Sequence, residues 1–177
     1  MEQQFHAQPG NYLAFFSSFD YLQQVAGVFA QHSPDIPMWC QERGMSESER
    51  QGFLERFTPG GRGIGFAVLG GAFGEGIDLP GTRLIGAFIA TLGMPQVSGI
   101  NEEMQRRMEA RFGAGYAYTY LYPGLQKVVQ AAGRVIRTTQ DRGVVFMMDE
   151  RFAQHNVRRL LPRWWKIETL SLPPAQT

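Results

Sequence analysis

Hydrophobic positions along the chain form two alternating patterns. Short, continuously apolar runs predict buried strands, and longer stretches with an apolar residue every three or four positions predict amphipathic helices. Strands are expected at 11–16, 36–40, 64–71, 84–93 and 143–149. Helices are expected at 19–31, 46–57, 100–113, 122–137 and 151–161.

Strands that alternate with helices and are apolar throughout are typical of an α/β fold. We therefore expect a three-layer sandwich, with a mostly parallel central sheet covered by helices on both faces. Ser46 and Glu49 form a capping-box pattern at the start of the helix over 46–57. Residues 1–170 are predicted to form one domain that ends in an edge strand at 164–172. The Pro-rich tail, 171–177, is expected to be disordered.

Composition supports a single globular domain, with 177 residues, 44% hydrophobic and 19% charged. The apolar runs are too short to span a bilayer and the first residues are polar, so we expect no membrane association and a cytoplasmic location. The single cysteine, Cys40, excludes an internal disulfide and a Cys-only metal or iron–sulfur site in this chain. We expect Cys40 to be buried at a strand end. The three histidines lack ligand spacing, so no metal site is predicted.

Charge is unevenly distributed, although the net charge is only +1. Residues 126–166 carry two Lys and seven Arg against three acidic residues, so the rest of the chain is net negative. This local excess of positive charge predicts an anionic partner, with a solvated basic surface as the alternative.

The segment after residue 129 contains the strongest candidate chemistry. On a helix with about 100° per residue, Gln130, Gly133, Arg134 and Arg137 fall on one arc, opposite an apolar face. Two Arg one turn apart beside a Gly form a fork suited to a phosphate chain. The solvated face of an ordinary amphipathic helix is the alternative.

The apolar strand that follows ends in Asp149 and Glu150, as a magnesium-binding strand end would. However, the chain contains no G-x-x-x-x-G-K-[ST] phosphate loop before it, and Phe152 occupies the place of the expected His. We therefore predict no metal role, and expect Asp149 and Arg151 to tie the strand to the next helix.

Three segments, in order, resemble motifs of one protein family. Residues 130–151 carry Q-x-x-G-R-x-x-R, then D-R-G, an apolar strand and D-E-R, which resembles motif VI of superfamily 2 helicases. Residues 70–81, GGAFGEGIDLPG, resemble motif V of the XPD/DinG branch, and residues 11–22 resemble its motif IV. The chain thus resembles the second RecA-like domain of an XPD/DinG-like DNA helicase.

The resemblance implies a domain that closes over ATP and Mg²⁺ bound mainly by an N-terminal motor domain of the same polypeptide. Arg137 would be the arginine finger and Arg134 a supporting cation, with Gln130 and Gly133 also at the nucleotide. Two acidic residues of motif V would lie at the same site, Glu75 and Asp78. Asp78 would accept a ribose hydroxyl or orient an Arg; alternatively, the acidic pair caps a helix or turn.

Single-stranded DNA is the second implied ligand. Ser17, Ser18, Gly70 and Gly71 would lie at the carboxyl ends of their strands, where hydroxyl and backbone N–H groups suit a phosphate backbone. Ordinary turn chemistry is the alternative for each residue. Four tyrosines could stack on bases, but we favour strand and core packing because aromatic residues are strand formers: Tyr116, Tyr118, Tyr120 and Tyr122.

The expected function is the C-terminal motor domain of an ATP-dependent DNA helicase that unwinds 5′-to-3′ as a monomer. Without a phosphate loop, this piece alone is expected to be inactive. The resemblance also implies that an iron–sulfur cluster is possible elsewhere in the full polypeptide, with none in this chain. Two alternatives remain: a free-standing nucleic-acid-binding module of the same fold without ATPase activity, and a flavodoxin-like small-molecule binder.

Overall fold

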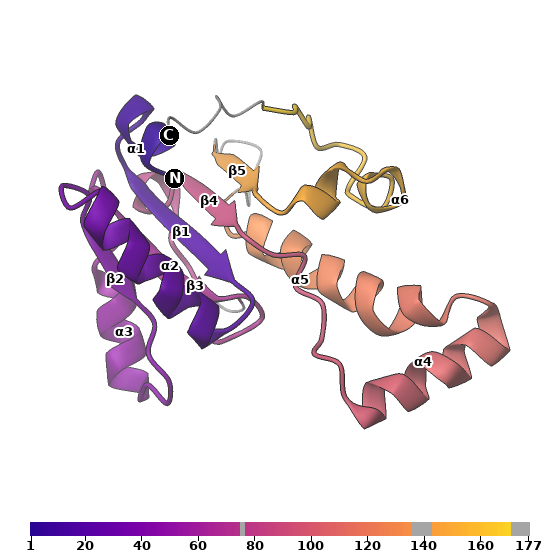
Figure 1. Ribbon diagram of the computed structural model, residues 1–177. Helices are drawn as coiled ribbons and strands as arrows, with labels where there is room; N and C mark the ends of the chain where they lie inside the picture. Colours follow the sequence, from indigo (N-terminus) through magenta and orange to yellow (C-terminus); the bar gives the residue numbers. More distant parts are fainter. Residues whose placement is uncertain (75–76, 136–142, 171–177) are drawn as a thin grey trace.

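A computed structural model describes residues 1–74, 77–135 and 143–170. Their strands form one sheet in the order β2-β3-β1-β4-β5, and each adjacent pair is parallel (Figure 1). The strands are β1 (Asn11–Phe16), β2 (Met38–Cys40), β3 (Gly63–Val68), β4 (Gly86–Ile89) and β5 (Val144–Met147). Each strand predicted between residues 11 and 149 is present, but β2, β4 and β5 are shorter than predicted and β3 ends three residues earlier, at Val68. The parallel α/β fold is confirmed.

Helices connect consecutive strands or flank the sheet. They are α1 (Glu2–Ala7), α2 (Phe19–His32), α3 (Glu47–Glu55), α4 (Gly99–Phe112), α5 (Tyr122–Ala132) and α6 (His155–Arg158). Short turns of other helical types are η1 (Gly81–Arg83), η2 (Ala117–Leu121) and η3 (Glu150–Ala153). The π-helical turn η2 leads directly into α5. Among the described residues, no helix is both long and apolar enough to cross a membrane.

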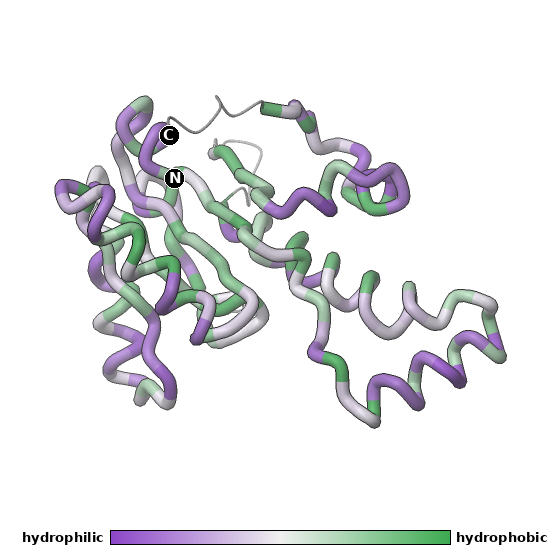
Figure 2. The backbone as a smooth tube through the Cα atoms, viewed as in Figure 1, coloured by the Kyte–Doolittle hydropathy of each residue, from purple (hydrophilic) through white to green (hydrophobic). Residues whose placement is uncertain are grey.

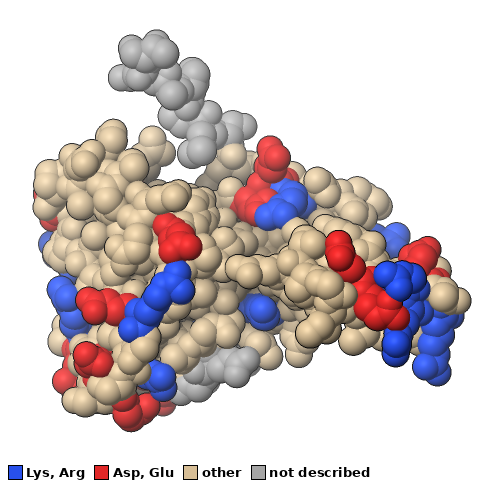
Figure 3. Space-filling model, turned by 60° about the horizontal axis from the view of Figure 1, so that its bottom comes forward, with Lys and Arg blue, Asp and Glu red and all other residues tan. Residues whose placement is uncertain are grey.

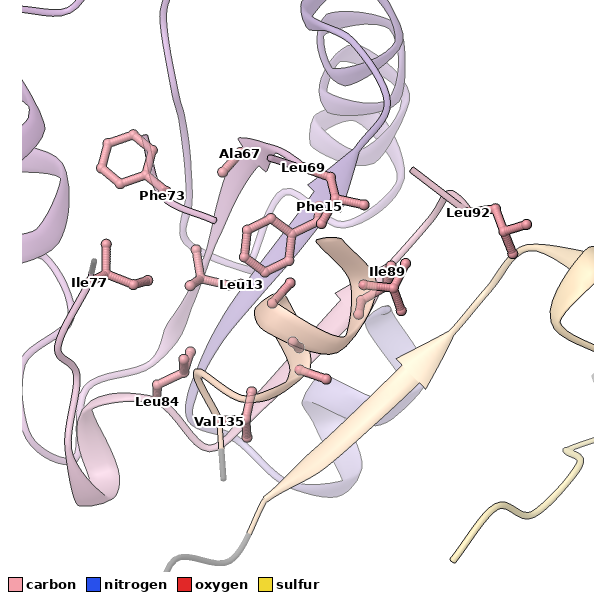
Figure 4. Packing of buried hydrophobic residues seen from close by; sticks show 14 of the residues in the cluster. Leu13, Phe15, Ala67, Leu69, Phe73, Ile77, Leu84, Ile89, Leu92 and Val135 are labelled. Carbon is pink, nitrogen blue, oxygen red and sulfur yellow. The ribbon is translucent and has the colours of Figure 1, made fainter. Parts of the chain in front are cut away.

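The central strand β1 is buried on both faces, as its continuous apolar run predicts. Leu13 and Phe15 join one hydrophobic cluster and Tyr12, Ala14 and Phe16 join another, because side chains alternate along a strand. Helices α1 and α2 contribute to the second cluster, and α3 and α5 contribute to the first. Figure 4 shows the first cluster from close by. Helices thus cover both faces of the sheet.

A helical hairpin extends beyond the sheet (Figure 1). It comprises residues 97–122, which we call the arm, and its first helix, α4, buries none of its residues. Figure 2 shows α4 as largely hydrophilic. The two helical segments cross closely at Gly115, where an added Cβ would lie 2.3 Å from the Gln105 carbonyl oxygen.

The capping box at the start of α3 is confirmed. The Ser46 side chain accepts a hydrogen bond from the Glu49 backbone N–H, and the Glu49 carboxylate accepts one from the Ser46 N–H at 2.6 Å.

The helix predicted over 122–137 is too long. α5 ends at Ala132, and Gly133–Val135 form a turn in which the N–H groups of Arg134 and Val135 donate to carbonyls three residues earlier. Such bonds tighten the last turn of a helix. They direct Val135 into the core beside Gly143, where an added Cβ would lie 2.2 Å from the Val135 Cγ1.

The edge strand predicted at 164–172 is absent from its described part, residues 164–170. Trp165 and Ile167 instead pack against the first cluster, and Arg158 donates to the Ile167 carbonyl at 3.1 Å. The helix expected at 151–161 is replaced by the shorter η3 and α6. Cys40 does end a strand, but it is half-buried rather than buried. α1 was not anticipated from the sequence.

Candidate functional site

Helix α5 runs between the two ends of the parallel strands. We call the side of the sheet where the strands end the carboxyl edge, and the side where they begin the amino edge. Near its start, Gly124 meets Gly93 just beyond the carboxyl end of β4, where an added Gly93 Cβ would lie 3.0 Å from the Gly124 carbonyl oxygen. Beyond its end, Val135 lies against Gly143, next to the amino end of β4. The predicted site residues that the structure describes therefore form two groups, one at the carboxyl edge and one at the amino edge.

Ser17 and Gly70 are neighbours at the carboxyl edge. They follow β1 and β3, whose last residues, Phe16 and Val68, are paired, and the Leu69 N–H donates to the Phe16 carbonyl at 2.9 Å. Both are exposed. Gly70 has a φ of 74°, which side-chain-bearing residues rarely adopt. The predicted location of these residues at strand ends is confirmed, whereas their contact with DNA stays a prediction.

Ser18 has a local structural role at this edge. Its side chain accepts a hydrogen bond from the Tyr21 N–H at 3.1 Å and caps α2. The free N–H groups of the α2 amino terminus therefore lie at the same edge, and such groups attract anions. Gly71 and Gly74 continue the turn after β3, with the Gly74 N–H donating to the Gly71 carbonyl at 2.9 Å.

Two cations at this edge were missed by sequence reasoning. Lys127 of α5 lies against Gly70, whose added Cβ would be 2.8 Å from the Lys127 Cδ. Arg43 pairs with Asp20 in the first turn of α2 at 2.8 Å and lies over the Phe19 ring. Lys127 could have been found, because it lies one turn before Gln130 on the predicted helix. Arg43 could not have been found, because no pattern in the neighbouring sequence places it at this edge.

The amino edge holds Arg134. Its side chain is half-buried, and its buried Nε atom has no hydrogen-bond partner among the described residues. Gly133 is exposed at the C-cap of α5, and Gln130 is half-buried in the last turn. These residues do not share one arc of a continuous helix as predicted, because the helix ends between them. The negative end of the α5 dipole favours a cation at this position.

The remaining nucleotide-site predictions concern three residues. Arg137 and Glu75 lie outside the described residues. Asp78 is exposed between Ile77 and Leu79, which are buried in the same cluster as Val135 (Figure 4). The segments that carry Asp78 and Arg134 are thus anchored in one cluster.

Asp149 and Arg151 connect β5 to η3, as predicted. One Asp149 carboxylate oxygen accepts hydrogen bonds from the Arg151 backbone N–H at 3.0 Å and from its Nε at 2.8 Å, and the other contacts the Arg151 Nη2. The hydrogen bonds from Arg151 lower the pKa of Asp149. The described residues bring no three His, Cys, Asp or Glu side chains together as a metal site.

The tyrosines of the arm are not in a strand or in the core, apart from Tyr120. They lie on the helical segment before and within the first turn of α5, and Tyr116, Tyr118 and Tyr122 are exposed. The prediction of strand packing is therefore wrong for this segment. The rings contact one another, with centroids 5.6 Å apart for Tyr116 and Tyr120 and 5.2 Å apart for Tyr118 and Tyr122.

Comparison with known proteins identifies relatives over most of the chain. The model of the helicase C-terminal domain family matches residues 1–168. The probable ATP-dependent helicase MJ0942 of Methanocaldococcus jannaschii is 32% identical over 160 residues, which cover 81% of this chain and 24% of that protein. The ATP-dependent DNA helicase chl1 of Schizosaccharomyces pombe is 25% identical over 175 residues, covering 88% of this chain and 20% of the relative. The chain thus spans only a quarter or less of the length of these relatives.

Solved structures share the fold. The structure XPD_APO superposes with a TM-score of 0.69 at 19% identity, over 89% of this chain and 32% of that one. Domain 2 of the DEAD-box helicase Mss116p, bound to an RNA duplex, gives a TM-score of 0.53 at 12% identity, over 86% of this chain and 48% of that one. At these identities the likeness concerns the fold, and the expected RecA-like architecture is confirmed.

Proposed function

The chain belongs to the family of helicase C-terminal domains, and from this membership we propose that it acts as the second motor domain of an ATP-dependent DNA helicase within a longer polypeptide. One observation supports this assignment most. α5 places Arg134 at one edge of the sheet and Lys127, against Gly70, at the opposite edge. A motor domain needs these two faces, one for nucleotide and one for nucleic acid, on a single rigid body.

The amino edge is proposed to close over ATP. Phosphoryl transfer is accelerated by positive charge placed where negative charge accumulates on the phosphates. Arg137 would supply the finger and Arg134 a second cation, since the buried Arg134 Nε is an unused donor. Four further residues complete this face in the proposal: Gln130, Gly133, Glu75 and Asp78. Asp78 would accept a hydrogen bond from a ribose hydroxyl or orient an Arg side chain.

The partner in this site is proposed to be the N-terminal motor domain of the same polypeptide. It would hold ATP and Mg²⁺, because this chain has no phosphate loop. Magnesium there would neutralise the phosphate oxygens when bound. In this arrangement the present chain contributes cations, orients them by its core contacts, and excludes water on closure.

The carboxyl edge is proposed to hold the backbone of single-stranded DNA. Ser17, Ser18, Gly70 and Gly71 offer hydroxyl and backbone N–H groups, and the α2 amino terminus adds a positive dipole end. Lys127 adds a full charge beside Gly70. None of these groups reads a base, which suits a motor that moves along any sequence.

Helix α5 would couple the two faces. Its 11 residues span roughly 16 Å as a rigid element. Closure of the two motor domains around ATP would therefore move the DNA-facing edge with the nucleotide-facing edge. The 5′-to-3′ direction and action as a monomer are part of this proposal.

Arg137→Ala in the full-length protein tests the assignment. We expect DNA-stimulated ATP hydrolysis to fall by roughly 10³-fold, with nucleotide binding largely kept. Arg107→Ala is the control, because Arg107 lies on α4 and pairs with Glu103. Unchanged turnover in Arg137→Ala would remove this residue from the nucleotide site.

A further inference from the structure

A groove of about 300 Å³ lies between the arm and α6. Its walls include Tyr116 and Tyr122 on one side and Asn156 and Arg159 on the other. The groove adjoins the carboxyl edge of the sheet, because the Tyr116 hydroxyl donates to the Met94 sulfur at 3.1 Å and Met94 follows β4. It is separate from the positions assigned above to DNA, which follow β1 and β3.

The tyrosine rings in this groove are exposed but held in place. Tyr116 is 51% exposed and Tyr122 is 40% exposed. The contact with Met94 and the neighbouring Tyr120 ring, which is buried, restrain the Tyr116 ring. A restrained, accessible aromatic face is the surface on which an unpaired base stacks, whatever its sequence.

The opposite wall supplies a cation. Arg159 is exposed, and within the described part of the chain it forms no ion pair. Glu109 also lines the groove, but its carboxylate accepts a hydrogen bond from the Gly115 N–H at 2.6 Å. Figure 3 shows charged side chains of both signs over α4, and a second group of acidic and basic side chains between the arm and the sheet. Among the described residues, the guanidinium of Arg159 thus has no acidic partner and is available to pair with a phosphate.

We infer that this groove is a base-stacking subsite for single-stranded DNA. A base stacks on Tyr116, with Tyr122 beside it, and Arg159 contacts an adjacent phosphate. The subsite extends the DNA path from Ser17 and Gly70 across the end of β4 toward α6. It rests on the proposed function, since it presupposes that the carboxyl edge faces a single strand.

The test measures the affinity of the full-length protein for a fluorescently labelled oligothymidylate. Tyr116→Ala is expected to raise the Kd at least about fivefold, the loss of one base–aromatic stack. Tyr116→Phe keeps the ring and its contact with Tyr120 but loses the hydroxyl contact with Met94, so it should retain most of the wild-type affinity. Phe112→Ala is the matched control: Phe112 is on the same arm and 52% exposed, but it does not line the groove. The Kd of the Phe112→Ala variant for the oligothymidylate is expected to equal that of wild type.

Arg159→Gln gives an independent readout. Removing one phosphate contact should reduce the slope of log K against log salt by about 0.7, whereas the tyrosine variants should leave the slope unchanged. A wild-type Kd for Tyr116→Ala, or an equal loss in Phe112→Ala, would overturn the subsite while leaving the helicase proposal intact. If the wild-type protein neither binds the oligonucleotide nor hydrolyses ATP, both proposals fail.

Discussion

The side chain of Lys127 lies against the bare backbone of Gly70, so that a methyl group on Gly70 would lie 2.8 Å from the Lys127 Cδ. This contact joins the loop after β3 to α5. It holds an ammonium group at the carboxyl edge, while the turn that follows the same helix carries Arg134 at the other edge. Because Gly70 also has a φ of 74°, both its conformation and its lack of a side chain are required.

Gly70→Ala is expected to destabilise the domain by about 1–2 kcal/mol, because an L-residue is strained at this φ and its methyl displaces Lys127. Urea unfolding measures the change in free energy. Gly27→Ala is the control of opposite sign: Gly27 lies inside α2 with open space around its Cα, so alanine should stabilise the helix by roughly 0.5–1 kcal/mol. Equal effects at the two glycines would refute this account.

Arg134→Ala in the full-length protein is expected to lower the turnover number for ATP by about 10-fold or more, through loss of one cation near the phosphates. Arg134→Lys should recover little, because an ammonium lacks the planar fork of donors. Steady-state ATPase assays with saturating single-stranded DNA give the comparison. Full activity in the lysine variant would mean that charge alone matters at this position.

Asp149→Asn tests the ion pair after β5. Its carboxyl pKa is lowered in the folded state by the hydrogen bonds from Arg151, so its contribution to stability is present above its ordinary pKa and is lost as pH falls through the lowered value. Wild type should thus be more stable than the Asn variant at neutral pH and lose this advantage as pH falls below the ordinary carboxyl pKa of 3.8. The effect is small because the Arg151 side chain is 39% exposed. A pH-independent difference in the free energy of unfolding would contradict this.

Ser46→Ala removes the cap of α3 and should cost about 1 kcal/mol of stability. Chemical denaturation of this chain measures the loss. Ser48→Ala serves as its control, because Ser48 is exposed within the same helix and makes no capping bond there. That change is expected to be neutral or slightly stabilising, since alanine favours helices. A comparable loss in both variants would show that the capping bond is not the cause.

Local pattern predicted the features that depend on neighbouring residues in the chain. The unbroken apolar run of β1 indicated burial on two faces, and Ser46 with Glu49 indicated a helix start; the structure has both. The end of α5 could not be found this way. Val135 continues the helical period, but its place is determined by Gly143 on another segment, and that contact is tertiary.

The arm is a second region whose structure the local sequence pattern does not predict. Aromatic residues favour strands, so the run around Tyr118 indicated a strand. The segment is helical instead: Gly115 packs closely on the preceding helix α4, and Gly124 packs on Gly93, which lies far from it in the sequence. Of the predicted site residues, Ser17 and Gly70 could be placed because they immediately follow apolar strands. Lys127 and Arg43 depend on which helix covers which strand end.

The central place of β1 in the sheet has a consequence for synthesis on the ribosome. Among the described strands of the sheet, β1 is made before both of its neighbours: its β3 side can pair only after about residue 68 has been made, and its β4 side only after about residue 89. At roughly 5–20 residues per second, that leaves several seconds in which a strand rich in Phe and Leu lacks both neighbours. The nascent chain therefore passes through a period of vulnerability to aggregation that ends from the middle of the sheet outward, with β5 added last.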